Sequence, residues 1–239
     1  MARKKPQRFE KEVVPGMKKI VTTSWDDGHK LDIKLAGLLQ KYNIPATFYV
    51  SPANREFSKE DLLSAQEIQF LSESFEIGGH TLHHPNLAQV PLDRAVDNIK
   101  AGKDMLEHIV RKKLQSFAYP YGVYTEQVQK AVLDLGFRVA RTTKRFSIEA
   151  SKEYDALPTT VHVYTHLSDV IRLPKYRTIQ WQVLARHFFD QTLENGGTFH
   201  LWGHSWEVDK CKEWKNLEAV LEYLSNRADV AYVNNGDLV

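Results

Sequence analysis

The stretch Ser24-Trp25-Asp26-Asp27-Gly28-His29 places two adjacent carboxylates between a short β-like run, residues 19–23, and a run of leucines at helix spacing. In barrels of alternating strands and helices, active sites form at the carboxyl ends of the strands. Two neighbouring acids repel each other, so a site that keeps both of them charged needs a cation or a shared proton. On this stretch alone, the competing interpretation is that Asp26 or Asp27 only caps the following helix.

The same alternation of strand and helix patterns continues along the chain. Short apolar or β-branched runs predict strands at residues 19–23, 45–50, 75–77, 115–118, 137–141, 157–163, 198–202 and 230–233. Amphipathic patterns between them predict a helix after His29 and helices that begin at Ser58, Pro91, Thr125 and Thr178. A last helix, around residues 217–224, precedes the final strand. The fold class is therefore α/β with a mainly parallel sheet, and seven or eight strands favour a (β/α) barrel over an open sheet.

The length of 239 residues suits a single core. We predict a basic N-terminal extension over residues 1–18 and one barrel domain over residues 19–239. The extension is interpreted as a solvated terminus, with a weak contact to an anionic surface as the alternative. A net charge of +2 gives no reason to expect nucleic-acid binding. Cys211 is the only cysteine, which excludes an internal disulfide and a metal site built from several cysteines.

The sequence also limits where we expect the protein to act. No run approaches the roughly 20 apolar residues that cross a bilayer, so no membrane span is expected. The basic N-terminus lacks the apolar region of a secretory signal. This predicts a cytoplasmic protein, or an extracytoplasmic one if a leader has been removed. The sequence gives no indication of the oligomeric state.

Two histidines four residues apart extend the acidic cluster into a candidate metal site. On a helical turn, the spacing of His80 and His84 would put both imidazoles on one face. One carboxylate would complete a ligand set of nitrogen and oxygen that suits Zn²⁺, and also cobalt, nickel or iron. The ion would acidify a bound water, and the second carboxylate would take its proton. His83 is a rival ligand, and a group of surface loop histidines is the competing interpretation.

Four motifs resemble those of the polysaccharide deacetylase family, also called carbohydrate esterase family four. The first motif of that family, Thr-Phe-Asp-Asp-Gly, corresponds to residues 24–28. The second, His-Ser/Thr-x-x-His, corresponds to residues 80–84, and the following Pro85 also matches. The third, Arg-x-Pro-Tyr, corresponds to residues 118–121, and a late Leu-x-His motif to residues 201–204. The resemblance covers most of the chain, and the first two motifs are the more specific ones.

The resemblance implies a distorted (β/α) barrel of about seven strands that removes the acetyl group from an N-acetylated sugar or polysaccharide. Carried over position by position, it implies that Asp26 is the general base. Asp27, His80 and His84 would be the metal ligands, most simply of Zn²⁺. His204 would be the general acid that protonates the leaving amine.

The chain departs from the family pattern at three places. Ala118 stands where the family has an arginine that orients the catalytic aspartate. We hypothesise that Arg141, at the end of the fifth predicted strand, supplies this positive charge to Asp26. The family also has a fourth motif, separate from the late Leu-x-His motif, with an aspartate and a tryptophan that tune the acid. This fourth motif has no clear counterpart in residues 142–155. The last motif contains one extra residue, which keeps His200 as a second candidate for the acid.

Several residues near the late motif are candidates for contacts with the substrate. Tyr121, Trp202 and Trp206 either form a platform for a sugar ring or pack in the core. Glu207 either contacts the substrate, orients His204 or is an exposed loop acid.

Two other patterns have less support. Gly203-His204-Ser205-Trp206-Glu207 approaches the nucleophile elbow of serine hydrolases, but Glu207 occupies the place of the second glycine. His162, Tyr164 and His166 alternate, which is typical of one face of a strand more often than of a second metal site.

We therefore predict a metal-dependent hydrolase that releases acetate from an N-acetylated carbohydrate. Two other classes stay open at this point. One is a related hydrolase of another non-peptide C–N bond, in a cyclic ureide or a formamide, which the altered third and fourth motifs favour. The other is a non-catalytic sugar-binding relative. The presence of all five candidate metal and catalytic residues argues against it.

Overall fold

The computed structural model describes residues 19–149, 154–164 and 180–239. The predicted basic extension and His166 lie outside these residues. Across the described ranges, no helix is long and apolar enough to cross a membrane.

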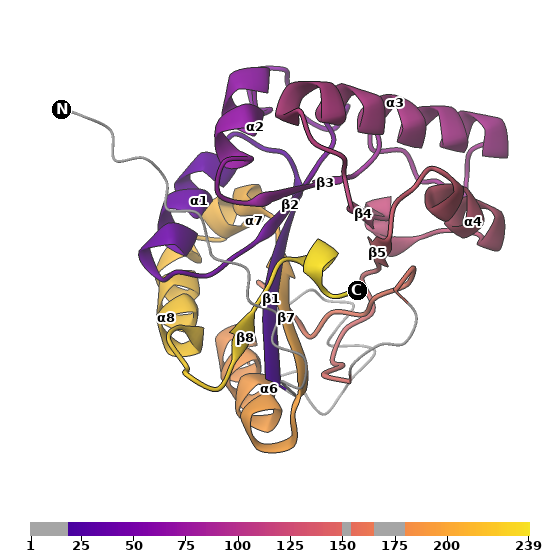
Figure 1. Ribbon diagram of the computed structural model, residues 1–239. Coiled ribbons are helices and arrows are strands. Elements are labelled where there is room, and N and C mark those ends of the chain that lie inside the picture. The colour runs from indigo at the N-terminus through magenta and orange to yellow at the C-terminus, as the bar shows by residue number, and fades with distance from the viewer. Residues whose placement is uncertain (1–18, 150–153, 165–179) are drawn as a thin grey trace.

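One curled sheet forms the centre of the molecule (Figure 1). Its strand order is β5-β4-β3-β2-β1-β7-β6, β8 lies beside β1, and the paired strands run parallel. The strands are β1 Lys19–Asp27, β2 Thr47–Val50, β3 Glu76–Gly79, β4 Ser116–Ala118, β5 Val139–Arg141, β6 Val161–His162, β7 Gly197–Gly203 and β8 Ala231–Tyr232. This distorted α/β barrel confirms the predicted fold class.

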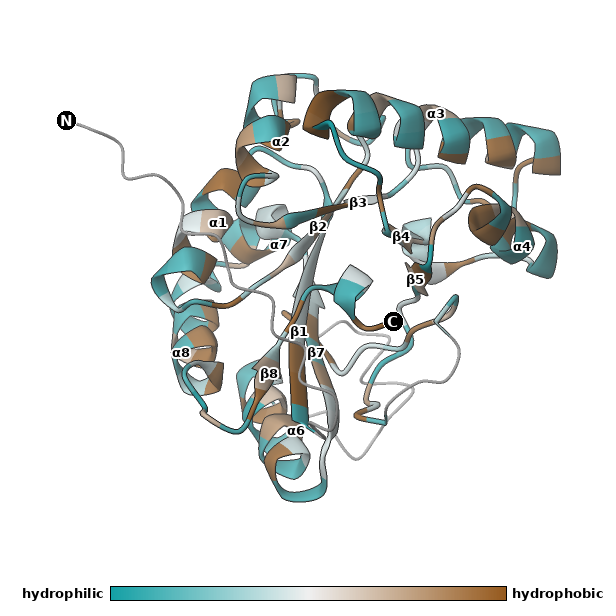
Figure 2. Cartoon of the chain, viewed as in Figure 1, coloured by the Kyte–Doolittle hydropathy of each residue, from teal (hydrophilic) through white to brown (hydrophobic). Residues whose placement is uncertain are grey.

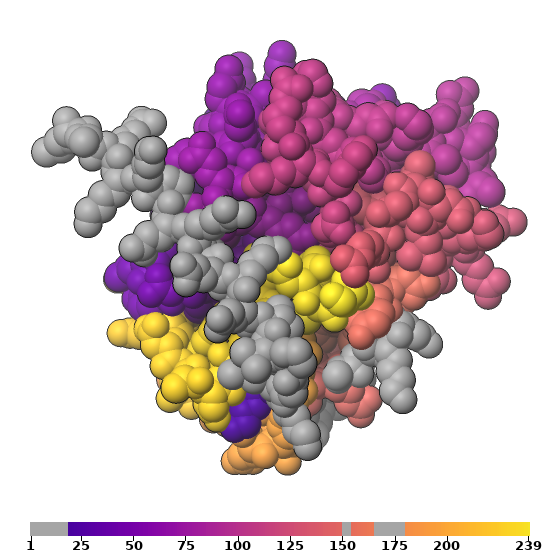
Figure 3. Space-filling model, viewed as in Figure 1, coloured from indigo at the N-terminus to yellow at the C-terminus, as the bar shows by residue number. Residues whose placement is uncertain are grey.

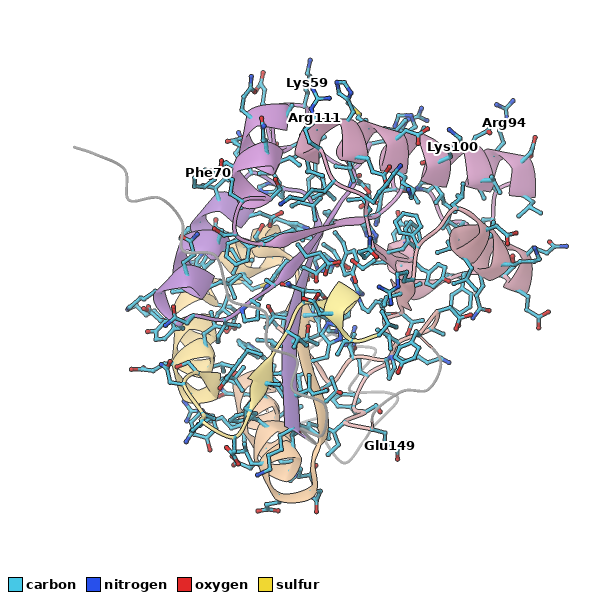
Figure 4. The ribbon with its side chains drawn as sticks, viewed as in Figure 1. Lys59, Phe70, Arg94, Lys100, Arg111 and Glu149 are labelled. Carbon is cyan, nitrogen blue, oxygen red and sulfur yellow. The ribbon has the colours of Figure 1, made fainter. Side chains whose placement is uncertain are left out.

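Helices surround the sheet on its outer side (Figure 1). They are α1 Asp32–Lys41, α2 Ala65–Leu71, α3 Leu92–Val110, α4 Glu126–Asp134, α6 Trp181–Asn195, α7 Ser205–Lys210 and α8 Trp214–Leu224, with short 3₁₀ turns η1 Pro120–Gly122 and η3 Asn235–Asp237. α3 buries Ile99 and Leu106 against the sheet, while Arg94 and Lys100 extend from its outer side (Figure 4). The hydropathy colouring shows the same division, with mainly hydrophilic residues on the outer turns (Figure 2).

Capping chemistry explains where two of these helices begin. Thr125 accepts a hydrogen bond from the Val128 amide, so the predicted start of α4 is confirmed. The helix expected from Ser58 begins only at Ala65, because Ser64 and Glu67 form a complete capping box. The Ser58 hydroxyl instead bonds Asp61 within a turn.

The strand predictions are correct in place but not in length. β1 continues through Asp27, so the two carboxylates close the strand instead of following it. The run predicted over residues 157–163 forms only a two-residue strand, β6. The short helix α7, directly after β7, was not predicted from the sequence.

The C-terminal turn η3 closes the end of the barrel opposite these carboxylates. Asn235 is fully buried there, accepts a hydrogen bond from Thr22 at 2.7 Å and donates one to the Tyr49 hydroxyl at 2.9 Å. The backbone N–H of Asn235 also donates to the Thr47 hydroxyl at 2.9 Å, and Thr47 is the first residue of β2. Figure 3 shows these last residues, in yellow, filling the middle of the face that is in view.

Replacing Asn235 tests this closure. Asn235→Ala is expected to lower the free energy of unfolding by about 2 kcal/mol, because two buried hydroxyls lose their partner. Urea unfolding would measure the change. Asn195→Ala, at an exposed site, should change the same free energy by less than about 0.5 kcal/mol. Equal effects of the two substitutions would contradict the assigned role of Asn235.

Candidate active site and metal centre

The backbone at the end of β1 turns two neighbouring carboxylates into the same site. Successive side chains of a strand ordinarily point to opposite faces. Asp27 has a φ of 83° and Gly28 a φ of 74°, so the chain leaves the extended conformation at this point. A Cβ atom on Gly28 would lie 2.7 Å from the Val50 side chain, so this turn needs glycine. Asp26 and Asp27 are both buried at this turn.

The second pair of candidate ligands lies in the loop that follows β3. Thr81 and His84 have φ values of 68° and 59°, and no helix forms here. The two imidazoles therefore come together through a bend of the loop and not through the spacing of a helical turn. The Thr81 hydroxyl accepts a hydrogen bond from the His84 amide at 3.0 Å, which stabilises the bend.

Helix α3 holds this loop in place. Asn98 accepts hydrogen bonds from the amides of Leu82 and His83, each at 3.0 Å. Gly102 lets the helix approach, because a Cβ there would lie 2.5 Å from the Thr81 backbone. The Nδ1 atom of His83 bonds the carbonyl of Ala53 at 3.0 Å, and His83 is not part of the ligand group. Asn98 was not predicted from the sequence; a polar residue on the inner side of an amphipathic helix is the signal that could have indicated it.

Three buried side chains bring possible metal-ligand atoms close together. The Nε2 atoms of His80 and His84 are 3.1 Å apart, and Asp27 Oδ1 lies 3.8 Å and 3.5 Å from them. Trp206 donates its indole N–H to Asp27 Oδ2 at 2.8 Å, while the buried Oδ1 has no hydrogen-bond partner among the described residues. Three such atoms repel each other unless a proton or a cation lies between them.

The protonation state of His80 also suits a metal ligand. Its Nδ1 lies 2.7 Å from the Ala118 carbonyl oxygen, which can only accept, so Nδ1 carries the proton and Nε2 offers its lone pair. Burial lowers the pKa of His80 to about 4, against the opposing effect of the nearby aspartates, so the ring is neutral near pH 7. Two imidazoles and one carboxylate with these properties fit a divalent cation such as Zn²⁺.

Asp26 lies beside this ligand group and pairs with a buried arginine. Both of its carboxylate oxygens accept hydrogen bonds from Nη2 of Arg141, which is fully buried. Burial raises the pKa of Asp26, but the Arg141 guanidinium, together with His80 and His204, more than offsets this, so the net pKa lies below its usual value. Arg141 on β5 is paired in register with Ala118 on β4. Ala118 stands where the family has its arginine, so the guanidinium of Arg141 approaches Asp26 from the neighbouring strand, β5. This is the geometry that our hypothesis requires.

A second buried cluster surrounds His204, the residue that precedes α7. Its Nδ1 lies 2.7 Å from Glu207 Oε2 and 3.3 Å from His162 Nε2. Burial by itself lowers the pKa of His204. The Glu207 carboxylate and the two aspartates outweigh this effect and raise the pKa to about 9. His204 is thus an imidazolium near pH 7. Glu207 is buried and lies against His162 and His204, which favours the alternative that it orients His204 over a contact with substrate.

The other histidine candidates differ from His204 in protonation. Burial lowers the pKa of His200 to about 3, and its Nε2 bonds the Ser24 hydroxyl at 2.8 Å. A buried, neutral ring on β7 is a poor proton donor. Burial likewise lowers the pKa of His162 to about 4, despite Glu207, and its Nδ1 bonds the Tyr164 carbonyl at 3.1 Å. His162 is 2% exposed, so the expected half-exposed strand surface was wrong.

The aromatic candidates separate by exposure. Trp202 is 3% exposed and its ring lies 4.7 Å from the Arg141 guanidinium, so it packs in the core and offers no platform for a sugar. Tyr121 is 48% exposed and lies against His84, with ring centroids 4.7 Å apart. Trp206 is half-buried and bonded to Asp27, as described above. The Ser205 hydroxyl is buried beside the Asp32 carboxyl, and Glu207 stands where a nucleophile elbow has its second glycine, so the serine-hydrolase interpretation gains no support.

Comparison with known proteins relates this chain to one family. A sequence model described as polysaccharide deacetylase matches residues 14–140, more than half of the 239 residues. The peptidoglycan-N-acetylmuramic acid deacetylase PdaC of Bacillus subtilis is 26% identical over 122 residues, 50% of this chain and 25% of that protein. The chitooligosaccharide deacetylase of Azorhizobium caulinodans is 29% identical over 118 residues, 48% of this chain and 54% of that protein. The chain thus spans about half, or less, of the length of these relatives.

Solved structures share the fold. A putative polysaccharide deacetylase from Mycobacterium smegmatis superposes with a TM-score of 0.70 at 15% identity, covering 95% of this chain and 91% of that one. A CE4 family pseudoenzyme from Bacillus anthracis superposes with a TM-score of 0.57 at 18% identity, covering 92% and 65%. Because a pseudoenzyme has the same fold, any activity has to be argued from the site residues.

The buried pair of Asp26 and Arg141 predicts a strong effect on stability. Arg141→Met is expected to lower the free energy of unfolding by about 3–5 kcal/mol, because it leaves a buried carboxylate without its counter-charge. The double variant Asp26→Ala with Arg141→Met should lose less, because it removes both charges. Denaturant unfolding at neutral pH measures both changes, and also that of Asp26→Ala alone. A double variant as unstable as the two single variants summed would show that the charges are not coupled.

Proposed function

The chain belongs to the polysaccharide deacetylase family, and we propose that it is a metal-dependent hydrolase that removes the acetyl group from an N-acetylated sugar or polysaccharide. The observation that carries the proposal is the buried, unpaired Oδ1 of Asp27, which faces the Nε2 atoms of His80 and His84. A site of this kind, flanked by a paired carboxylate and a protonated imidazole, has the groups that amide hydrolysis requires.

In this proposal, Asp27, His80 and His84 hold a divalent cation, most simply Zn²⁺. When bound, such an ion acidifies water and stabilises the negative charge that develops on an acyl oxygen. Asp27 presents Oδ1 because Trp206 occupies its other oxygen. His80 presents Nε2 because Ala118 accepts the proton on Nδ1.

Asp26 is proposed as the general base. Its ion pair with Arg141 keeps the carboxylate charged and limits its rotation, since both oxygens contact the same guanidinium nitrogen. The carboxylate accepts a proton from the water that attacks the carbonyl carbon. Arg141 acts through Asp26, so it is a positioning residue in this mechanism.

His204 is proposed as the general acid. Its imidazolium donates a proton to the sugar nitrogen as the C–N bond breaks, which releases acetate and a free amine. Glu207 bonds Nδ1 at 2.7 Å and so leaves Nε2 as the donating atom. Glu207 therefore does for this acid what the family's missing fourth motif would do.

The proposal predicts acetate release from a panel of N-acetylated oligosaccharides by the Zn²⁺-loaded protein. Asp26→Asn should reduce kcat by about 10²–10⁴-fold, because the amide cannot accept the proton, while bound zinc stays stoichiometric. Asp27→Asn should instead lose zinc. Acetate assays together with metal analysis measure both effects. Asp93→Asn, at an exposed site on α3, is the matched control and should change neither.

The same panel separates the competing functions. Turnover of an allantoin-like ring or a formamide, without acetate release from any sugar, would replace the proposed substrate class. Near-wild-type activity of Asp26→Asn would overturn the assignment of the base. Sugar binding without turnover in the zinc-loaded protein would identify a non-catalytic relative.

The two charged pairs also predict the pH dependence of kcat/KM. The profile should be bell-shaped, because Asp26 must be ionised and His204 protonated. On the acid side, activity should fall only at pH values below the usual pKa range of carboxylates, since Arg141 lowers the pKa of Asp26. The alkaline limb should lie at or below pH 9, since His204 has a pKa of about 9 and a nearby cation would lower it.

Glu207→Gln should move only the alkaline limb, toward lower pH by about one to three units, because it removes the charge that stabilises the imidazolium. The amide can still accept the Nδ1 proton, so orientation is retained. Asp209→Asn, at an exposed position of the same helix, should leave both limbs in place. An alkaline limb that does not move in Glu207→Gln would disprove the assignment of the acid.

A further inference from the structure

The two candidate imidazole ligands differ in what contacts their outer nitrogen. His80 Nδ1 bonds the Ala118 carbonyl at 2.7 Å, which determines its tautomer. Within the part of the chain that the structure describes, His84 Nδ1 is buried without a hydrogen bond. The Glu56 carboxylate lies 3.4 Å from it, through Oε1, which is a few tenths of an ångström beyond an ordinary hydrogen bond. A carboxylate can only accept, so it favours the proton on Nδ1 of His84.

Glu56 is held in this position from more than one side. It belongs to the loop between β2 and α2, and its amide bonds the side chain of the buried Asn54 at 2.9 Å. The Tyr121 hydroxyl donates to the same oxygen, Oε1, that faces His84. The Tyr121 ring also lies on the His84 ring, with centroids 4.7 Å apart. The carboxylate, the phenol and the imidazole therefore form one contact group.

This placement distinguishes Glu56 from a direct ligand. Oε1 faces Nδ1, the outer nitrogen, whereas Nε2 faces His80 and Asp27 on the other side of the ring. A cation held by Nε2 is therefore out of reach of Glu56, which is also absent from the ligand group. Glu56 is therefore placed to act on a bound cation chiefly through the His84 ring that it contacts.

We propose that Glu56 is a positioning residue that sets the tautomer and the basicity of His84 and thereby raises the affinity of the site for a divalent cation. The proposal rests on the assignment of His84 as a metal ligand in the proposed function. Acceptors on the outer nitrogen of a ligating histidine orient the ring and strengthen its lone pair, and their loss typically lowers metal affinity by about 10–100-fold. Glu56 would do for His84 what the Ala118 carbonyl does for His80.

The test measures Zn²⁺ affinity of the metal-free full chain by competition with a chromophoric chelator at fixed pH and salt. Glu56→Ala is expected to weaken Zn²⁺ binding by about 10–100-fold, and Glu56→Gln by less, because the amide oxygen still accepts a proton from Nδ1. Glu60→Ala is the matched control, since it removes an equally exposed acid from the same loop. It should bind Zn²⁺ as the unaltered protein does.

Two further measurements separate this role from others. In nitrogen NMR spectra of the zinc-loaded protein, His84 should be protonated on Nδ1. Saturating Zn²⁺ should restore most of the acetate-releasing activity of Glu56→Ala, because the residue acts through affinity; a contact with substrate would leave the activity low. Glu56 is exposed, so circular dichroism should show a folded variant.

Each other outcome has a defined meaning. Unchanged Zn²⁺ affinity in Glu56→Ala, or an equal loss in Glu60→Ala, would overturn the role of Glu56. Failure of the unaltered protein to bind Zn²⁺ would overturn the proposed function itself. Zinc binding by the unaltered protein without any activity would leave the role of Glu56 standing on the affinity data alone.

Discussion

The buried ion pair between Asp26 and Arg141 is the constraint on which the rest of the site depends. In the sheet order, β4, β3 and β2 lie between the strands that carry these residues, so the contact crosses the inside of the curled sheet. A carboxylate in such an interior is costly without a counter-charge, and a guanidinium is equally so. Each therefore requires the other, and both require the curvature that brings β5 opposite β1. The negative charge of Asp26, the proposed base, therefore depends on the curvature of the barrel.

The two neighbouring aspartates divide their tasks because their surroundings differ. Asp26 has both oxygens on Arg141, whereas Asp27 has one oxygen on Trp206 and one that faces the two imidazoles. The left-handed backbone at Asp27 makes this division possible, since an extended strand would direct the two side chains to opposite faces. Repulsion between adjacent acids is thus relieved by a guanidinium on one side and, in the proposed function, by a cation on the other.

The proposed acid is organised by a helix of six residues. α7 places Glu207 one turn after His204, and β6 brings His162 to the same nitrogen. In the proposed function, this cluster takes the role of the fourth motif, for which the sequence shows no counterpart. The third motif is similarly compensated, because Arg141 is paired in register with Ala118. In both places the charge that the family pattern leads one to expect is supplied from another segment of the chain.

Local patterns in the sequence were sufficient for the alternating fold, for the places of the strands, and for Asp27, His80 and His84 as candidate metal ligands beside Asp26. Periodicity and capping depend on neighbouring residues, so these features can be recognised within a short window. The partners of those side chains could not be recognised in this way. Arg141 was a hypothesis about Asp26, and Glu56 gave no signal, because each meets its partner across a distance in sequence that only the curled sheet closes. Which chemical groups are present, and at which strand ends, can therefore be inferred from the amino-acid sequence. Which charges face each other depends on the tertiary structure, because burial and strand register, not sequence spacing, bring them into contact.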